Sequence, residues 1–349
     1  MTGRQGSDGQ WEPPCLPPHF RVECAAVSVP APSPESQRLP LPLPPARLVQ
    51  VLGERPSPVV GWLANRVMDA VCALPASLKD SLARFVGWLA FTLGIRLQVA
   101  LENLTHAYPE MSDAERRKIA LGAYITMARV VLESIDEKDH VDTHWEDPEV
   151  KGEAWEALKA NIARGQGALL VTAHFGNWER AGKMLLRRGI PLNALVRPLK
   201  GALNMRIVDS RLAAGGGLIY PKGAIAEAQE AVRLGETVLM LLDQSLPAKA
   251  AVFVPFFGRP ASTTPAMAVV AQRTGAPVFV VMGIRDESGQ KLRLEVEGPI
   301  LPPEGLGEQD AITAHTAAVT AVLEKYVRRY PDQWLWLHRR WKVQPPPEA

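Results

Sequence analysis

The sequence predicts an α/β fold, in which a mixed, mainly parallel sheet is flanked by helices and preceded by amphipathic N-terminal helices. Three observations predict it. From about residue 167 onward, short runs rich in Val, Leu and Ile alternate with helical stretches. Before them come two longer segments with apolar residues at helical spacing. Before those, prolines are concentrated, with 13 of the 31 in the first 58 residues.

The composition is that of an ordinary globular protein and excludes several classes. Of the 349 residues, 47% are hydrophobic and 22% charged. Lys and Arg number 39 against 37 Asp and Glu, so the formal charge is only +2 and no nucleic-acid partner is expected. Cys15, Cys24 and Cys72 form no CxxC pair. They predict neither a disulfide framework nor a zinc ribbon, and they favour a reducing compartment.

The proline-rich start divides the chain. Proline density without apolar periodicity predicts that residues 1–58 are disordered or polyproline-like. This segment has no apolar run of signal-peptide length and carries five acidic residues, which argues against a signal or transit peptide. The folded domain is therefore expected over residues 59–342, with helices over 59–140, an α/β catalytic part over 150–342 and a disordered tail over 343–349. Deletion of residues 1–58 should leave fold and activity nearly intact.

Two amphipathic helices open the folded part. The first has Asn65, Arg66 and Asp69 opposite its apolar stripe, and the second has Arg84 on its far side. The apolar stripes are Val60, Leu63, Val67, Val71 and Leu74, then Leu82, Phe85, Val86, Leu89, Leu93 and Leu97. No run reaches the roughly 18 uncharged apolar residues that a membrane-spanning helix needs. Either these stripes cover the core of the domain, or one side of the helices lies in a membrane interface.

The α/β part shows strands and helices in alternation, which predicts a mainly parallel sheet. The predicted strands are 168–173, 191–196, 237–242, 277–284 and 291–296, and the helices between them include 178–188, 225–234 and 265–274. Residues 291–297 alternate apolar and polar side chains, so this strand is expected at an edge.

Several familiar motifs are missing. The sequence has no GxSxG elbow, no GxxxxGK[ST] loop and no GxGxxG fingerprint. His140 and His144 have the i,i+4 spacing of a metal pair, but Pro148 ends any helix there. We interpret this segment as a solvated charged connector. No metal and no cofactor are expected.

The sharpest candidate site follows the first predicted strand. That strand runs into His174, and a helix begins a few residues later, which is where catalytic groups gather in parallel sheets. With His174 in the turn and Glu179 in the first helical turn, the carboxylate should reach the imidazole. It would fix the tautomer and make His174 a better general base. The alternative is a packing or surface histidine.

Polar residues follow other strands as well. Arg197 offers a fixed guanidinium for a phosphate or carboxylate, and Asp243, with Gln244 beside it, is expected to position that arginine or a substrate hydroxyl. The alternative is salt bridges that cap the strands. Thr264 is predicted to be the N-cap of a helix, which would bring helix-end amides and Arg259 near an aromatic loop. The alternative there is a buried strand followed by a well-capped helix.

Two cationic segments each have two interpretations. Residues 334–342 interleave Trp with Arg and Lys, which suits either a lipid headgroup zone or a terminal strand and turn packed on the sheet. Lys183, Arg187 and Arg188 end the helix after the candidate site. They suit either docking of an acidic carrier protein or a solvated helix end.

Several motifs together resemble a known family, the late acyltransferases of lipid A biosynthesis (the lauroyl/myristoyl acyltransferases), collinearly over about residues 60–342. The motifs are ENLTHAYPEMSDAERRKI (102–119), HFGNWE (174–179), the pair Arg197-Pro198, LLDQ (241–244), VPFFGRPASTTPA (254–266) and QWLWLHRRWK (333–342). The family uses an HX4D/E signature, and Glu179 at its last position points away from the usual glycerol-phosphate acyltransferases.

The resemblance implies a glycerol-phosphate-acyltransferase-like sheet and an acyl transfer from acyl carrier protein to a hydroxyl of a membrane glycolipid, foremost a lipid A precursor. His174 would take the proton of that hydroxyl, Glu179 would orient His174, and Arg197 would hold a phosphate. No cofactor, metal or covalent acyl-enzyme is implied. The location would be the cytoplasmic face of the inner membrane, peripheral or shallowly anchored. Another glycolipid such as a phosphatidylinositol mannoside, a coenzyme A donor and a non-catalytic relative stay open as alternatives.

Overall fold

A computed structural model describes residues 58–135, 150, 152–197, 202–289 and 291–346. All of them fall within one compact unit of the chain. The disorder predicted for residues 1–58 falls outside the described residues except at Pro58, which begins a helix. The segment with His140 and His144 also lies outside them.

A six-stranded sheet forms the centre of the fold, in the order β3-β2-β4-β1-β7-β8. Its strands are β1 (Ala168–Thr172), β2 (Leu192–Leu195), β3 (Gly217–Ile219), β4 (Thr237–Leu241), β7 (Val278–Arg285) and β8 (Leu292–Ile300). All neighbouring strands run parallel except β7 and β8, which are antiparallel. The mainly parallel sheet and the edge position of β8 are therefore confirmed. The short strand β3 was not predicted, because the glycines at 215–217 carry no apolar pattern.

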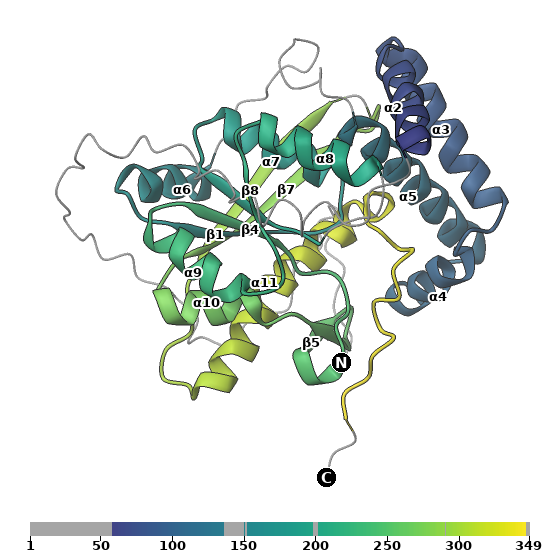
Figure 1. The fold of residues 1–349 in the computed structure, drawn as a ribbon. Helices are drawn as coiled ribbons and strands as arrows, with labels where there is room; N and C mark the ends of the chain where they lie inside the picture. Colours follow the sequence, from purple (N-terminus) through teal and green to yellow (C-terminus); the bar gives the residue numbers. More distant parts are fainter. Residues whose placement is uncertain (1–57, 136–149, 151, 198–201, 290, 347–349) are drawn as a thin grey trace. The chain divides into compact units, whose positions relative to one another are not determined.

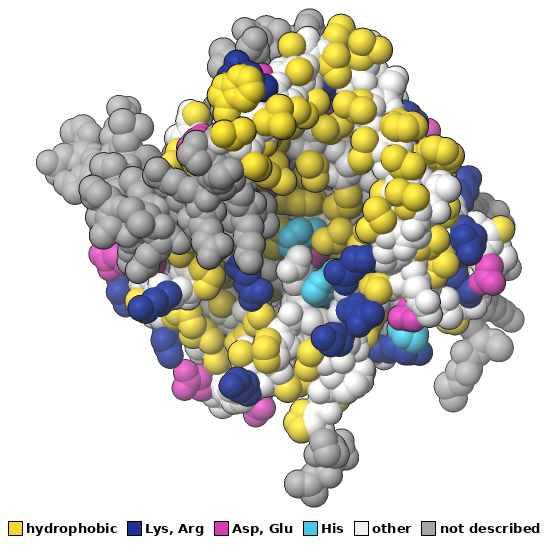
Figure 2. All heavy atoms as spheres, turned by 45° about the vertical axis from the view of Figure 1, so that its right-hand side comes forward, with side chains coloured by type: hydrophobic (Ala, Val, Ile, Leu, Met, Phe, Trp, Pro, Cys, Tyr) yellow, Lys and Arg dark blue, Asp and Glu magenta, His cyan; other side chains and the backbone are white. Residues whose placement is uncertain are grey.

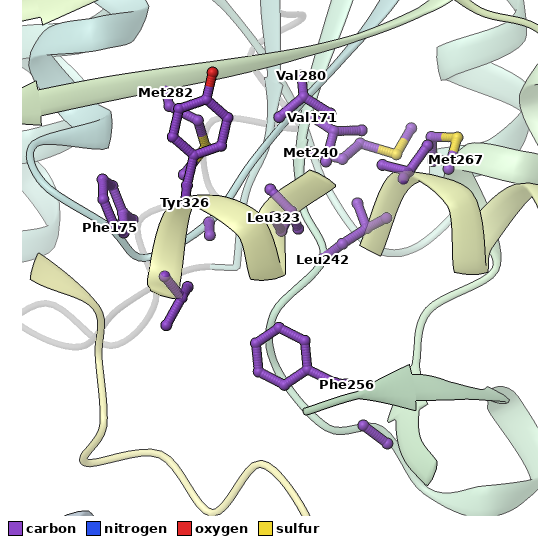
Figure 3. Packing of buried hydrophobic residues seen from close by; sticks show 14 of the residues in the cluster. Val171, Phe175, Met240, Leu242, Phe256, Met267, Val280, Met282, Leu323 and Tyr326 are labelled. Carbon is purple, nitrogen blue, oxygen red and sulfur yellow. The ribbon is translucent and has the colours of Figure 1, made fainter. Parts of the chain in front are cut away.

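Helices cover both faces of this sheet (Figure 1). One face carries α6 (Glu153–Ala163), α7 (Trp178–Arg187) and α8 (Ala202–Ala213), and the other carries α9 (Ala224–Arg233), α10 (Ala266–Thr274) and α11 (Glu308–Arg329). Strands covered on both faces need mainly apolar residues, which explains why the first four residues of β1 are apolar and all five are buried. Figure 3 shows Val171 and Val280 of the sheet packed with Leu323 and Tyr326 of α11.

The predicted aromatic loop around residues 254–260 is a two-stranded hairpin instead. β5 (Val252–Phe256) pairs antiparallel with β6 (Arg259–Thr263). Phe257 and Gly258 connect them with φ angles of 51° and 70°, the left-handed conformation that a two-residue hairpin turn of type I′ requires. The tight turn buries Phe256 and Phe257, so these rings belong to the core.

The described part of the chain begins with four helices, which come before α6: α2 (Pro58–Cys72), α3 (Ala76–Thr92), α4 (Leu97–Ala107) and α5 (Asp113–Ser134). α3 packs on α5 through small residues, since Ala83 and Gly87 are buried. A Cβ on Gly87 would lie 2.6 Å from the Ile125 Cα, so the helices touch backbone to backbone. Polar residues also face inward, because Asp80 of α3 pairs with Arg129 of α5 at 2.7 Å.

The large apolar side chains of α2 and α3 point away from the protein. α2 turns its polar side to α8, where Asp69 pairs with Arg206 at 2.9 Å. We call the exposed set the apolar face: Val59, Val60, Trp62, Leu63, Val67, Leu78, Phe85, Val86, Trp88, Leu89, Leu93 and Ile95. Most of the two predicted stripes belongs to it, so the interpretation that they cover the core is wrong. The face toward α5 consists mostly of small and polar residues, and Phe91 near the end of α3 is a large residue that packs edge to face on Tyr124 of α5.

The C-terminal tryptophans belong to the core, so residues 334–342 pack inward as the second interpretation expects, but they form turns and a single bridge at Trp334 instead of a strand. Trp334 and Trp336 are fully buried and lie edge to face, with ring centroids 4.6 Å apart. Arg340 is buried as well and donates to the Thr263 Oγ1 at 2.6 Å. This C-terminal segment therefore packs on the hairpin and the sheet.

No single helix in the described ranges is long and apolar enough to cross a membrane. Only α3 and α4 taken together pass by length and composition, and they are bent by 88° at the break between them.

Candidate active site

The turn between β1 and α7 is built by its sequence. Gly176 has a φ of +54°, and a Cβ there would lie 1.8 Å from the carbonyl oxygen of Gly283, so only glycine fits. Asn177 caps α7, because its side chain accepts a hydrogen bond from the Arg180 N–H at 2.9 Å. Helix α7 therefore begins at Trp178, and His174 stays in the turn.

The C-terminal segment holds this turn in place. Gly176 donates its N–H to the carbonyl of Gln333 at 2.8 Å, and Leu335 donates to the carbonyl of His174 at 3.0 Å. Phe175 and Trp334 form an isolated antiparallel bridge between the two segments. The candidate site therefore depends on residues about 160 positions apart in the chain.

Asp243 holds His174 at two atoms. β4 lies next to β1, so the residues after the two strands meet at one edge of the sheet. The His174 Nδ1 lies 2.8 Å from one Asp243 carboxylate oxygen, and the His174 backbone N–H donates to the other at 2.8 Å. The indole of Trp334 donates to that second oxygen at 2.9 Å.

These contacts fix the charge of Asp243 and the tautomer of His174. Burial alone would raise the pKa of the Asp243 carboxyl, but the His174 ring and the hydrogen bonds from His174 and Trp334 lower it to about 2. The ionised carboxylate accepts the Nδ1 proton, which leaves a lone pair on Nε2. The Asp243 side chain is 3% exposed and that of His174 21%, so only the histidine can meet a substrate.

Two further side chains flank the imidazole. The carboxamide nitrogen of Gln244 lies 3.3 Å from the His174 Nε2. The ring of Trp178 lies edge to face with the His174 ring, with centroids 5.0 Å apart. A neutral imidazole with one nitrogen held by a buried carboxylate and the other accessible can act as a general base.

The structure corrects the predicted pairing of Glu179 with His174. Glu179 accepts hydrogen bonds from Arg211 of α8, with the Arg211 Nε at 2.9 Å, and from the Trp178 indole at 3.0 Å. Burial would raise the pKa of the Glu179 carboxyl, but the charge and hydrogen bonds of Arg211 lower it. The helix starts at Trp178, which turns Glu179 toward α8. Asp243 makes the contact with the His174 ring that the sequence predicts for Glu179, and its hydrogen bonds among the described residues are with His174 and Trp334 and not with Arg197.

The remaining predicted site residues lie near this edge or on the hairpin. Arg197 and Arg259 are exposed, at the end of β2 and the start of β6. Thr264 is half-buried, and its Oγ1 accepts from the Ala266 N–H at 3.3 Å. The N-cap position of α10 belongs to Pro265, one residue later than predicted. Of the seven predicted site residues, the structure brings His174, Asp243 and Gln244 into direct contact.

The predicted docking patch at the end of α7 does not form. Lys183 is buried and donates to the Ser210 Oγ at 2.7 Å. Arg188 is half-buried and donates to the carbonyl of Met184 at 3.0 Å, while Arg187 is exposed. The helix turns Lys183 toward α8, so these cations do not share an open surface.

Sequence reasoning missed the roles of Trp334 and His338. Trp334 holds Asp243, and the His338 Nε2 accepts a hydrogen bond from the Ser245 N–H at 3.0 Å. Burial lowers the pKa of His338 to about 4, so its ring is neutral near pH 7. Both residues lie in the QWLWLHRRWK motif. That motif could have raised them as candidates, although nothing in the sequence places it beside β4.

Other candidate sites among the described residues carry less chemistry. No group of three His, Cys, Asp or Glu side chains in the described ranges is arranged to hold a metal ion. A groove of about 630 Å³ lies at the opposite end of the sheet, lined by residues such as Arg164, Gly167 and Pro277, which precede β1 and β7. The face in Figure 2 shows a hollow with histidine side chains in it, hydrophobic side chains on one side and Lys and Arg on another.

Comparison with known proteins decides the family. Residues 53–343 match the family described as bacterial lipid A biosynthesis acyltransferase. The chain belongs to this family. The match covers well over half of the chain and includes the His174 turn, β4 and the C-terminal segment. The assignment makes the protein an acyltransferase of lipid A biosynthesis type and confirms the resemblance stated above.

Individual relatives agree with the family. The chain is 26% identical to the lipid A biosynthesis palmitoleoyltransferase of Escherichia coli K12 over 298 residues, which is 82% of this chain and 92% of the relative. It is 27% identical to the lauroyltransferase of the same organism, over 81% and 92% of the two chains. It is also 28% identical to the phosphatidylinositol mannoside acyltransferase of Mycolicibacterium smegmatis, over 54% of this chain and 59% of the relative.

Proposed function

We propose that this protein transfers a fatty acyl group from acyl carrier protein to a hydroxyl of a membrane glycolipid, and that the glycolipid is a lipid A precursor. The observation that carries the proposal is the His174–Asp243 pair, with the Nε2 of His174 open to a substrate, in a chain of the lipid A acyltransferase family. A non-catalytic relative would have no need of this arrangement.

The pair supplies the base that acyl transfer needs. The His174 Nε2 takes the proton of the acceptor hydroxyl while that oxygen attacks the thioester carbonyl. Asp243 keeps the Nδ1 proton in place and stabilises the imidazolium that forms. The imidazolium then gives its proton to the departing thiolate. Glu179 serves as a positioning residue in this scheme, because it binds Trp178, which flanks the His174 ring.

The acceptor and the donor would bind to different residues around His174. Arg197 is exposed at the end of β2, so it can bind a phosphate of the glycolipid. An acyl carrier protein is acidic, and the exposed Arg96, Arg259 and Arg339 offer it a cationic surface. Arg96 is close enough to His338 to affect its pKa, which puts it near the site.

The apolar face is the surface that would contact the membrane. α2 and α3 place mostly small and polar residues against the protein and most of their large apolar residues outside, the reverse of a helix that covers a core. Trp62 and Trp88 belong to this face, and tryptophan favours the headgroup level of a bilayer. We propose peripheral or shallow attachment to the cytoplasmic side of the inner membrane.

The test compares the parent protein with His174→Ala on acyl carrier protein charged with a fatty acid and a lipid A precursor in detergent. Mass spectrometry should show one added acyl group with the parent protein. The variant should be slower by about 100-fold or more, the scale of a lost general base. A folded His174→Ala protein with activity within a few-fold of the parent would remove His174 from the mechanism. Acyl-coenzyme A, offered in parallel, tests the donor.

A second acceptor has specific support. The relative from Mycolicibacterium smegmatis is named for a phosphatidylinositol mannoside, and its match covers 54% of this chain and 59% of the relative. The chemistry at His174 would be the same with either glycolipid. Transfer to a phosphatidylinositol mannoside, and none to the lipid A precursor, would replace the acceptor and keep the mechanism.

A further inference from the structure

Gln244 donates to the nitrogen that must act as the base. Its carboxamide lies 3.3 Å from the His174 Nε2. Because the Nδ1 proton is held by Asp243, Nε2 carries a lone pair and can only accept. The Gln244 atom that faces it is therefore the amide nitrogen. At 3.3 Å the contact is long for a hydrogen bond, so a substrate hydroxyl can replace it.

Several main-chain donors around His174 are already used within the protein. In the first turn, the N–H groups of Phe175, Gly176 and Asn177 donate to the carbonyls of Ala173, Gln333 and Gly283. In the turn after β4, Ser245 donates to His338 and Leu246 to the Ser262 Oγ. A thioester carbonyl at His174 needs a donor for the negative charge that develops on its oxygen. The side-chain amide of Gln244 is the donor that lies at the reacting nitrogen.

We infer that Gln244 is a catalytic residue that stabilises the oxyanion of the tetrahedral intermediate, and that His338 is a positioning residue that holds Gln244 in place. The inference rests on the proposed acyl transfer. It goes beyond the sequence prediction, in which Asp243 and Gln244 only position Arg197 or a substrate hydroxyl.

The acceptor hydroxyl gives its proton to the His174 Nε2 and displaces the Gln244 amide from it. The hydroxyl oxygen bonds to the thioester carbon, and the carbonyl electron pair moves onto the carbonyl oxygen. The freed amide N–H donates to this oxyanion. When the carbonyl reforms, the C–S bond breaks, and the sulfur leaves with the proton from His174.

His338 fixes the turn that carries Gln244. The His338 Nε2 accepts a hydrogen bond from the N–H of Ser245, the residue that follows Gln244. A ring nitrogen can accept this bond only when it carries no proton. Burial keeps that ring neutral near pH 7. The His338 segment is itself held by Asn103, whose amide donates to the carbonyls of Trp336 and His338 at 2.7 and 2.6 Å. The donor is therefore oriented before substrate binds, which is what makes such donors effective.

The first experiment measures kcat and both KM values for Gln244→Met, which keeps the size of the side chain and removes the donor, and for Gln244→Glu. Gln98→Met on the exposed side of α4 is the matched control. Loss of one oxyanion donor should lower kcat by about 10²–10³-fold with both KM values within about threefold. The control should match the parent protein. A kcat within about threefold of the parent, or a loss confined to the acceptor KM, would overturn the inference.

The second experiment tests the positioning role with His338→Ala, Gln244→Met and the double variant. If His338 acts through Gln244, its substitution should lower kcat about tenfold in the parent and have little effect when Gln244 is already Met. Independent, multiplying losses would contradict positioning. His338→Asn replaces His338→Ala if the latter does not fold. A parent protein inactive on both glycolipids would count against the proposed function, whereas an active parent with full activity in Gln244→Met would count against this inference alone.

Discussion

At His174, the partner of the ring comes from a distant strand and not from the nearest carboxylate. Glu179 is five residues away, but the Asn177 cap starts the helix at Trp178 and directs Glu179 to Arg211. Asp243 is 69 residues away in sequence and one strand away in space. In the proposed mechanism the two carboxylates therefore act differently: Asp243 contacts the base itself, and Glu179 contacts Trp178 beside it.

The two carboxylates should respond differently to removal of their charge. Asp243→Asn keeps the size but loses the anion that holds the Nδ1 proton and the imidazolium, so kcat should fall by about 10³–10⁴-fold. Glu179→Gln should lower kcat less, by about tenfold, because Glu179 reaches His174 only through Trp178. Steady-state kinetics on both proteins, with the thermal transition as a check of folding, measure the difference. Equal losses of kcat, or a larger loss for Glu179→Gln, would instead support the pairing of Glu179 with His174 that the sequence predicts.

At the level of elements, the two sides of α3 have different surroundings. The inner side packs by backbone contact on α5, and the outer side is part of the apolar face. The amphipathic pattern is visible in the sequence, but which side faces the protein follows from residue size. Only a stripe of small residues such as Ala83 and Gly87 lets the helices approach so closely.

Two helical glycines test this packing. In Gly87→Ala, the new methyl group would meet the α5 backbone at 2.6 Å, so the protein should lose about 1–3 kcal/mol of unfolding free energy. In Gly182→Ala on α7, the methyl group would meet Leu192 and Leu239 at 3.5 and 3.9 Å, which is ordinary contact. That variant should be unchanged or gain up to about 1 kcal/mol from helix propensity. Urea denaturation of both measures the contrast, and a stabilised Gly87→Ala protein would contradict the close packing.

The outer side should govern membrane binding. Replacing Phe85 and Leu89 by Glu adds two charges to the apolar face and should lower binding to phosphatidylethanolamine–phosphatidylglycerol vesicles by about tenfold or more. Leu306→Glu, at an exposed leucine before α11, is the control and should bind like the parent. Cosedimentation measures all three. If the double variant binds vesicles as the parent does, another surface makes the contact.

For the whole molecule, buried histidines tie stability to pH. Burial lowers the pKa of His338 to about 4 and shifts the pKa of His315 downward as well. The folded state then binds protons less readily than the unfolded chain, in which histidine titrates near 6.5. Stability is therefore full above about pH 6.5 and falls as the pH drops toward 4. Asp243, with its pKa of about 2, stays ionised throughout this range.

Chemical denaturation at pH 7.5 and pH 5 tests this dependence. The unfolding free energy should be lower at pH 5, while the secondary structure of the folded protein stays the same. His315→Gln should weaken the dependence, because the substituted side chain takes up no proton in the unfolded chain. Equal stability at both pH values would contradict the assigned burial of these rings.

The sequence by itself determined the class of fold, the alternation of elements, the edge strand β8 and the turn that carries His174. These features are local, since apolar periodicity and turn residues act over a few neighbours. It also determined the family, through motifs such as HFGNWE and QWLWLHRRWK.

The tertiary structure alone decided which groups touch. Asp243, Gln244 and His338 reach the site because β4 pairs with β1 and because Trp334 and its neighbours pack against the hairpin and the turn. The same packing buried Lys183 and turned the large residues of α2 and α3 outward. Contacts between residues 69 positions apart (His174 and Asp243) or 235 positions apart (Asn103 and His338) depend on strand order and on how side chains fill the whole core. No local sequence pattern predicts either of these.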